Sequence, residues 1–305
     1  MIGSRGQLGQ CLAQQLAADP RVRAVEALAR PDVDLADAAS LDAALDRAAP
    51  AAGDVVANAA AYTAVDACES DEATARAVNA LAPERMAARC ARAGARFVHV
   101  STDYVFPGDA SEPYREDDET GPRTAYGRTK LEGEQRVAAA CPDALVVRTS
   151  WVFGPGRNFV GAILRQAGLR RAGEASGPLR VVDDQSGSPT YAADLASGLR
   201  QLVAAGASGL FHLCNRGATT WWDFARAILD ESGHADLAID RARTADLALP
   251  APRPAYSVLD VARAAALGVA LRPWREALVA YLASDPGRAL VAASAPREAA
   301  RAGGA

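Results

Sequence analysis

Cysteine is scarce in this sequence, and it shows no paired spacing. The 305 residues include 5 cysteines, at positions 11, 68, 90, 141 and 214, with no C-x-x-C pair among them. An odd, scattered set argues against a disulfide framework or a zinc site and favours a reduced compartment. Apolar runs long enough to span a bilayer are also missing, as is the apolar stretch of a signal peptide. We therefore expect a soluble, cytoplasmic protein without a membrane partner.

An excess of charge of either sign is missing too. The 33 Lys and Arg residues against 37 Asp and Glu residues give a net charge of −4, and the pI is about 5.5. This balance excludes the basic surface typical of nucleic-acid-binding proteins. Half of the residues are apolar, and a chain of this length has ample core for one large or two modest domains.

Short apolar runs alternate with longer, alanine-rich helical stretches. Strands are expected at 24–28, 54–58, 96–100, 144–149, 178–182 and 209–213, and helices at 7–18, 40–49, 69–93, 126–140, 158–171, 189–204 and 220–232. This alternation is typical of an α/β fold, a Rossmann-like doubly wound parallel sheet.

The same alternation suggests a division of the chain. Residues 1–157 are expected to form an NAD(P)-binding Rossmann-like domain. Residues 158–283 are expected to form mainly a smaller α/β substrate domain, with part returning to the Rossmann sheet. Residues 284–305 are mostly small, with scattered arginines, and are expected to form a disordered tail.

A glycine-rich turn stands at the start of the sequence. Gly3, Gly6 and Gly9 read G-x-x-G-x-x-G and lead into the helix-forming segment LGQCLAQQLA. Such a loop normally joins a buried strand to a helix whose N-terminus receives a phosphate. Only Met1 and Ile2 precede it here, so we expect a truncated first strand, a stub ending at Ile2 between the strands at 24–28 and 54–58. Since that strand is central in this fold, we also expect the natural chain to start several residues upstream.

Arg30 follows the second apolar run. In a Rossmann-like fold this position lies near the adenosine ribose, where a basic residue accommodates a 2′-phosphate and an acidic residue would bind the 2′-hydroxyl of NAD. The sequence therefore favours NADPH as cofactor, with NADH as the alternative.

Tyr126 and Lys130 occur in the segment TAYGRTKLEGE. Four residues apart at a helix start, they share one face. A lysine ammonium and a cationic nicotinamide favour the phenolate of a tyrosine, and so make its phenol a usable acid. Thr102 lies in STDYVF, directly after the apolar run 96–100, where its hydroxyl can bind a substrate carbonyl. Together with the glycine loop, this arrangement is that of the short-chain dehydrogenase/reductase superfamily.

The resemblance extends to one family within that superfamily. Over about residues 3–283 the chain resembles the dTDP-4-dehydrorhamnose reductase family in eight segments in the family's order: NAAAYTAVDACE, AVNALAPERMA, HVSTDYVFPG, PYREDDETGPRTAYGRTKLEGE, VVRTSWVFG, VVDDQSGSPTY, GLFHLCNRGATTWWDFA and RPAYSVLD. Such enzymes reduce a 4-keto nucleotide sugar with a nicotinamide cofactor.

The resemblance implies a role for each matching residue. Tyr126 would donate the proton, Lys130 would hold the cofactor ribose and tune Tyr126, and Thr102 would orient the keto group. Thr102, Asp103 and Trp151 would contact the nucleotide sugar. The expected cofactor-binding residues, including those read directly from the glycine loop and strand end, are Gly3, Gly6, Gln7, Leu8, Gly9, Arg30, Asp34, Ala60, Ala61, Thr63, Tyr126 and Lys130.

The chain departs from the family at one position. Some members dimerise through a magnesium ion held by glutamates, one of them two residues past the last loop glycine. Cys11 occupies that position here and is a poor magnesium ligand. We expect no metal, and a monomer or weak homodimer.

Four other features are interpreted as structural. The acidic run 116–119 is expected to form a solvated face, and Asp183–Asp184 are expected to cap the loop leading into the next helix. His99 is interpreted as a core histidine, and Trp221–Trp222 are interpreted as packing residues of the smaller domain.

Two other functions share this fold. One is a non-catalytic regulatory subunit of the methionine adenosyltransferase beta type, and the other is a nucleotide-sugar epimerase or dehydratase. An S-S-x-x-V-Y type segment replaces STDYVF in many of the latter, so the motif favours the reductase.

Overall fold

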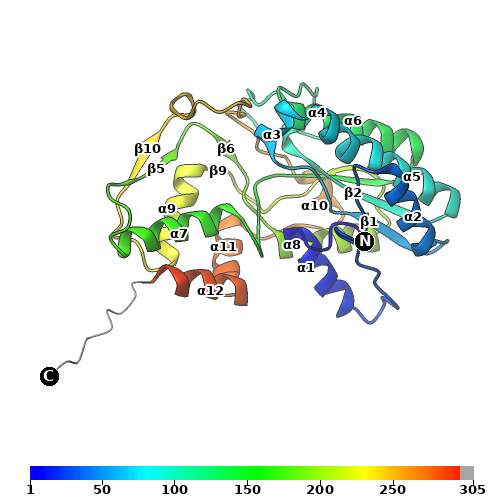
Figure 1. Cartoon of the computed structure of the whole chain (residues 1–305), viewed down its shortest axis with the longest axis horizontal. Helices are drawn as coiled ribbons and strands as arrows, with labels where there is room; N and C mark the ends of the chain where they lie inside the picture. Colours follow the sequence, from blue (N-terminus) through cyan, green and yellow to red (C-terminus); the bar gives the residue numbers. More distant parts are fainter. Residues whose placement is uncertain (296–305) are drawn as a thin grey trace.

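The structure is a computed structural model that describes residues 1–295. A four-stranded parallel sheet forms its centre, in the order β1 (Val55–Asn58), β2 (Arg96–Thr102), β3 (Leu145–Thr149) and β8 (Gly209–His212). The helices α1 (Gln7–Ala17) and α8 (Ala192–Ala204) lie on one side of it, and α2 (Ala38–Ala48), α5 (Ala82–Ala93) and α6 (Ala125–Ala140) on the other (Figure 1). The expected Rossmann-like fold is confirmed.

Both faces of the sheet are buried. Phe97 and Val146 point into the cluster that Leu41, Met86 and Val137 supply from α2, α5 and α6. On the opposite face, strand residues such as Val98 and Val147 meet leucines of α1 and α8. Burial on both faces explains why these strands are continuous apolar runs.

The first strand is a stub, as expected. The Ile2 N–H donates to the Ala57 carbonyl at 2.8 Å, and the Leu28 N–H donates to the Met1 carbonyl at 2.9 Å. Ile2 thus bridges Asn58 on one side and Leu28 on the other. The expected strand at 24–28 is wrong, since within it only Leu28 is paired. Two residues beside this segment provide too few backbone partners to hold it in a ladder.

The long helix expected at 69–93 is divided. It begins earlier, at α3 (Val65–Ser70), and continues through α4 (Glu72–Arg76) and the π-helical turn η1 (Ala77–Leu81) into α5. The helix expected to start at 189 starts at Ala192, because β7 (Thr190–Tyr191) pairs with β4 (Val152–Phe153).

The second half of the chain builds a smaller lobe, seen at the left of Figure 1. The helices α7 (Phe159–Arg171), α9 (Trp221–Glu231) and α11 (Trp274–Leu282) share a buried cluster around Phe153 and Phe224, with β5 (Leu179–Val182) and β10 (Ile239–Ala242) paired at its edge. The pair of β6 (Ser186–Gly187) with β9 (Thr219–Thr220) completes the lobe. Short elements η2 (Asp103–Val105), η3 (Thr244–Leu247) and α10 (Ala262–Ala266) lie in connecting segments.

The disordered tail expected from residue 284 is wrong for its first part. Residues Asp285–Ser294 form α12, whose N-cap Ser284 accepts from the Gly287 N–H. Leu290 and Val291 pack on the cluster of the smaller lobe. Tertiary packing thus stabilises a helix that is made mostly of small residues. The remainder, 296–305, lies outside the described residues. Between residues 1 and 295, no helix is both long and apolar enough to cross a bilayer.

Candidate functional site

The glycine loop is closely packed against its own helix and against the turn after β1. A Cβ on Gly9 would lie 2.7 Å from the Gly3 carbonyl carbon, and a Cβ on Gly3 would lie 2.7 Å from the Ala60 nitrogen. Gly3 also has φ of +90°, which favours glycine. α1 begins at Gln7 with Gly6 as its N-cap and no side chain capping it. Its first N–H groups are therefore free for a ligand.

A hollow of about 420 Å³ opens in front of this loop. Five of the predicted cofactor-binding residues line it, namely Gly3, Gly6, Arg30, Ala60 and Ala61. The sequence did not single out the other lining residues: Ile2, Arg5, Ala29, Val33, Leu35, Tyr62, Thr74 and Val78. Most of these residues are next to predicted residues along the chain, and this adjacency is the signal that could have indicated them.

Other predicted cofactor residues lie outside the lining. Asp34 accepts from the Arg30 guanidinium at 2.8 Å, which lowers the pKa of the Asp34 carboxyl. Thr63 is exposed, and the Leu8 side chain belongs to the core under the sheet. The Gln7 amide donates to the Arg157 carbonyl at 3.1 Å, which ties the loop to the chain after β4.

Tyr126 and Lys130 lie one turn apart at the start of α6, as predicted. Thr124 caps the helix by accepting from the Gly127 N–H at 3.0 Å. The Tyr126 ring meets the Tyr104 ring edge to face, with centroids 5.5 Å apart. Burial raises the pKa of the Tyr126 phenol well above its usual range, and the nearby Thr102 hydroxyl offsets part of that rise. The phenol therefore keeps its proton at neutral pH.

Lys130 is almost fully buried. Its Nζ donates to the Val100 carbonyl at 2.7 Å and lies 3.2 Å from Nε2 of His99. Burial lowers the pKa of the Lys130 amine to about 8, although the nearby Glu134 carboxylate opposes that shift. The expectation of a buried core histidine at position 99 is confirmed, with Lys130 as a direct neighbour.

Thr102 and Asp103 follow β2 at the same end of the sheet. The Thr102 hydroxyl donates to Oδ1 of Asp103 at 3.0 Å. Asp103 is buried, and its Oδ2 makes no hydrogen bond of good geometry within residues 1–295, although the Ser257 hydroxyl lies close enough to lower the pKa of the carboxyl. Burial raises the pKa of the Asp103 carboxyl to about 6. A buried acceptor left open in this way is suited to binding a ligand hydroxyl.

Trp151 lies just beyond β3, where it adopts φ of +47°. Thr102 and Thr149 are partners in the register of β2 and β3, so Trp151 follows at the same sheet edge. Its ring stacks on Trp221, with centroids 3.6 Å apart. A Cβ on Gly187 would lie 2.6 Å from Trp151 Nε1, so that glycine makes room for the ring. From the sequence, Trp221 was interpreted as a packing residue, and no motif indicated that its ring would stack on Trp151.

Two sequence interpretations need correction. Glu116, expected in a solvated face, is buried and accepts from the His212 N–H at 2.9 Å. Asp184 does not cap the loop leading into α8, because it accepts from the N–H and hydroxyl of Thr244 at the start of η3, while Asp183 pairs with Arg241. The contacts of Asp183 and Asp184 follow from the pairing of β5 with β10, a long-range pairing that the sequence did not reveal.

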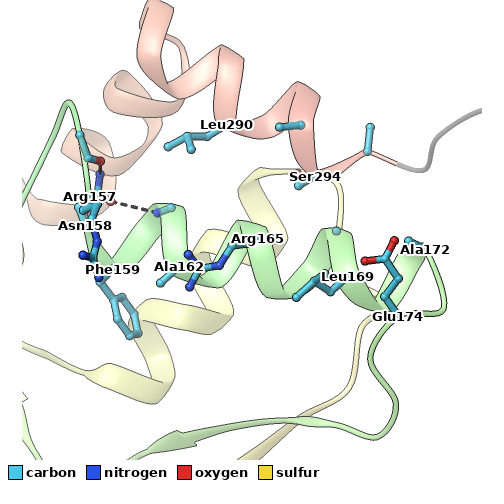
Figure 2. Close-up of a pocket in the computed structure, with 15 residues that line it drawn as sticks. Arg157, Asn158, Phe159, Ala162, Arg165, Leu169, Ala172, Glu174, Leu290 and Ser294 are labelled. Carbon is cyan, nitrogen blue, oxygen red and sulfur yellow. Dashed lines mark hydrogen bonds between the residues drawn. The ribbon is translucent and has the colours of Figure 1, made fainter.

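A larger hollow, of about 840 Å³, lies between α7 and α12. Figure 2 shows Arg165 and Leu169 on α7 and Leu290 on α12 around it. It contains none of the predicted site residues. The polar groups suited to chemistry converge at the sheet edge, and we place the candidate site there despite the smaller volume.

The described part of the chain holds no group of three His, Cys, Asp or Glu side chains suited to a metal ion. Cys11 is buried, and burial raises the pKa of its thiol to about 11, which disfavours the thiolate form that binds metal ions.

Comparisons with known proteins agree with this geometry. A family model described as the RmlD substrate binding domain matches residues 1–285. The chain is 44% identical to a dTDP-4-dehydrorhamnose reductase of Mycobacterium tuberculosis over 292 residues, 93% of this chain and 92% of the relative. It is 43% identical to a probable dTDP-4,6-dihydroxy-2-methyloxan-3-one 4-ketoreductase of Streptomyces antibioticus, covering 91% and 92%. A crystal structure of the Bacillus anthracis dTDP-4-dehydrorhamnose reductase in complex with NADP superposes with a TM-score of 0.82 at 30% identity, covering 92% and 96%.

Proposed function

The chain belongs to the RmlD substrate-binding-domain family, and on this premise we propose that it reduces dTDP-4-dehydro-β-L-rhamnose to dTDP-L-rhamnose with NADPH. The observation that carries the proposal is the meeting of four polar groups at one sheet edge. Tyr126 and Lys130 come from α6, and Thr102 and Asp103 from the end of β2.

The glycine loop fits a dinucleotide. A side chain on Gly3 or Gly9 would fill the cradle, and the first turn of α1 offers uncapped N–H groups to a pyrophosphate. Arg30, at the rim of the hollow, would bind the 2′-phosphate of NADPH. Ala60 and Ala61 would contact the ribose and nicotinamide side. When bound, the nicotinamide supplies the hydride.

Tyr126 would donate the proton to the oxygen of the reduced C4 carbon. A phenol whose pKa is raised by burial holds its proton until the substrate oxygen gains negative charge. Lys130 would hold the cofactor ribose beside it. Thr102, whose hydroxyl lies next to Tyr126, would orient the keto group.

The nucleotide sugar would lie between the two lobes. The open carboxylate oxygen of Asp103 would accept from a sugar hydroxyl, and the Trp151 ring, stacked on Trp221, offers an apolar face to the nucleotide. We divide the chain accordingly into a cofactor unit, 1–157, and a mainly substrate-binding unit, 158–283, from which β8 returns to the central sheet.

A coupled assay tests the proposal. NADPH oxidation at 340 nm would be followed with the purified keto sugar and the purified protein. Turnover that depends on both partners supports the reductase. Tight NADPH binding without turnover on any 4-keto nucleotide sugar would favour the regulatory-subunit alternative, and sugar conversion without net NADPH oxidation would favour an epimerase or dehydratase.

A second candidate substrate follows from the Streptomyces antibioticus relative, whose description names a different dTDP-linked ketone. A reductase of such a sugar would use the same proton donor. Comparison of kcat/KM for the two ketones, in the same assay, distinguishes the candidates.

A further inference from the structure

Lys130 is the only lysine in the chain; every other basic residue of its Lys and Arg complement is arginine. It ends a row of three buried polar side chains. Asn58 ends β1, His99 stands opposite it in the register of β2, and Lys130 reaches His99 from α6. All three side chains are at most 1% exposed. Water therefore cannot supply missing hydrogen-bond partners, and donors must match acceptors within the row.

The orientation of the Asn58 amide decides the arrangement of protons. Asn58 Oδ1 accepts from the Ala60 N–H at 3.1 Å, so its Nδ2 faces Nδ1 of His99, at 3.2 Å. The amide nitrogen is a donor only, and Nδ1 must accept from it. A neutral imidazole that accepts at Nδ1 carries its proton on Nε2. That proton points at Lys130 Nζ, 3.2 Å away.

A charged Lys130 conflicts with this arrangement. An ammonium group is a donor only, and it would face the Nε2–H as donor against donor. Turning the Asn58 amide over would relieve that conflict, but it would place Nδ2 against the Ala60 N–H. An uncharged amine satisfies every group: Nζ accepts from Nε2 and donates to the Val100 carbonyl.

The surrounding charges do not reverse this preference. Burial, the largest cause, lowers the pKa of His99 well below its usual range even without a charge on Lys130, so the imidazole is neutral. Glu134, one turn along α6, is the carboxylate that favours an ammonium at Lys130. Its two oxygens bind the Arg148 guanidinium of β3 at 2.9 and 2.7 Å, in a buried pair. Tyr126, on the preceding turn of α6, keeps its proton and carries no charge.

We propose that the Asn58–His99 pair holds Lys130 as an uncharged amine in the cofactor-free enzyme, with the Nε2–H of His99 as donor to Nζ. His99 and Asn58 are then positioning residues that act through Lys130. The functional meaning rests on the proposed reductase activity. Without a cation beside it, Tyr126 retains its proton in the resting enzyme, in the state that a proton donor needs.

The single lysine makes the charge measurable without any activity assay, so a failure here is separate from a failure of the proposed function. The enzyme would be produced with ¹³C,¹⁵N-lysine, freed of cofactor, and titrated by NMR, where one side-chain signal reports Lys130. We expect the amine to be at least half uncharged at about pH 8, well below the pKa of 10.5 that is ordinary for lysine. A signal of predominantly ammonium character at that pH overturns the proposal.

Asn58→Asp tests the role of the pair. A carboxylate at this position accepts from both the Ala60 N–H and a His99 Nδ1–H, which leaves Nε2 free to accept from an ammonium. We expect the proton affinity of Lys130 to rise at least tenfold. Asn79→Asp is the matched control, because Asn79 is equally buried and contacts Thr129, next to Lys130, but not His99. An equal rise in both variants would mean that charge alone acts, and would overturn the assignment to the pair.

The imidazole of His99 gives a check that does not depend on Asn58→Asp. With ¹⁵N-histidine only three rings contribute signals, and His212→Gln and His234→Gln assign the other two. The proposal requires the Nε2–H tautomer at His99 in the cofactor-free enzyme. Finding the Nδ1–H tautomer or an imidazolium would overturn it, even if Asn58→Asp failed to fold.

Discussion

Gly9 lies directly over the carbonyl of Gly3, so closely that a Cβ on Gly9 would be 2.7 Å from the Gly3 carbonyl carbon and 2.8 Å from Ser4 Cα. The contact holds the loop against the first turn of α1. It uses backbone atoms on both sides, which cannot rotate away as a flexible side chain can.

Gly9→Ala should therefore destabilise the protein and weaken cofactor binding. Overpacking typically costs about 1–3 kcal/mol, and a displaced loop would lose its fit to a pyrophosphate. Thermal melting and NADPH titration would measure the two effects. The matched control is Gly161→Ala, also the third residue of its helix, where the new Cβ would meet only ordinary contacts at 3.5 Å or more. An unchanged melting temperature in Gly9→Ala would contradict the argument.

Tyr126→Phe should lower kcat by about 10²–10⁴-fold, because the ring remains and only the proton is lost. KM values should stay close to those of the wild type. Tyr104→Phe, at the ring packed against Tyr126, is the control and should keep turnover within a few-fold. Near-normal turnover in Tyr126→Phe, with substrate still bound, would remove this residue from the proton-donor role.

Asp103→Asn should stabilise the protein at alkaline pH and inactivate it. The pKa of the Asp103 carboxyl rises from 3.8 to about 6 on folding, so the folded state favours the protonated form. The destabilisation is absent below about pH 4, grows between pH 4 and 6, and is complete above. It amounts to about 3 kcal/mol at most, at about 1.4 kcal/mol per unit.

Melting curves of wild type and Asp103→Asn at about pH 4 and pH 8 test this dependence. The variant should melt higher at pH 8, and the difference should vanish at pH 4. Asp117→Asn, in an exposed position nearby along the chain, should show no such pattern. A difference that grew as the pH fell would give the opposite sign and contradict the assignment.

Arg30→Ala should raise KM for NADPH and leave KM for NADH nearly unchanged, because only NADPH carries a 2′-phosphate. The existing pair with Asp34 is exposed, with 70% and 46% of the two side chains accessible, and such pairs contribute little. Arg30 is therefore available to a ligand. Arg47→Ala controls for the loss of a nearby positive charge. An equal effect on both cofactors would place the 2′-phosphate elsewhere.

Trp221→Ala should raise KM for the nucleotide sugar without changing KM for NADPH, since it removes the ring that supports Trp151. Trp222→Ala is the control at the adjacent position, where the ring packs under the Arg241 guanidinium, 3.9 Å from its carbon, instead. Steady-state kinetics with each substrate varied in turn would separate the two. A matching rise for both tryptophans would indicate a general loss of packing.

The sequence predicted best what depends on local pattern. The runs at 54–58, 96–100, 144–149 and 209–213 became strands of the central sheet, where burial on both faces favours continuous apolar residues. The run at 178–182 became β5, which pairs with β10 at the edge of the smaller lobe. The spacing of Tyr126 and Lys130 follows from the helix period alone. The segment at 24–28 has the same apolar character, but a strand exists only where a partner supplies hydrogen bonds, and Ile2 reaches only Leu28.

What the sequence missed depends on long-range contact. Trp151 and Trp221 are 70 residues apart in number. The pairing of β6 with β9, directly before α9, brings their rings together, since Gly187 of β6 lies against the Trp151 ring. The same holds for Asn58, His99 and Lys130, which come from two strands and a helix. α12 was missed because its small residues resemble a linker, although Leu290 and Val291 find a surface on the smaller lobe.

The burial of the single lysine has a practical consequence. Reagents that attack primary amines, such as succinimidyl esters used for dyes, biotin and cross-linkers, find no accessible lysine side chain on the folded protein. Modification of Lys130 then requires the core to open, and its rate becomes a measure of how often that happens. The rate of Lys130 modification, followed by mass spectrometry at this one residue, therefore reports how often the folded core opens.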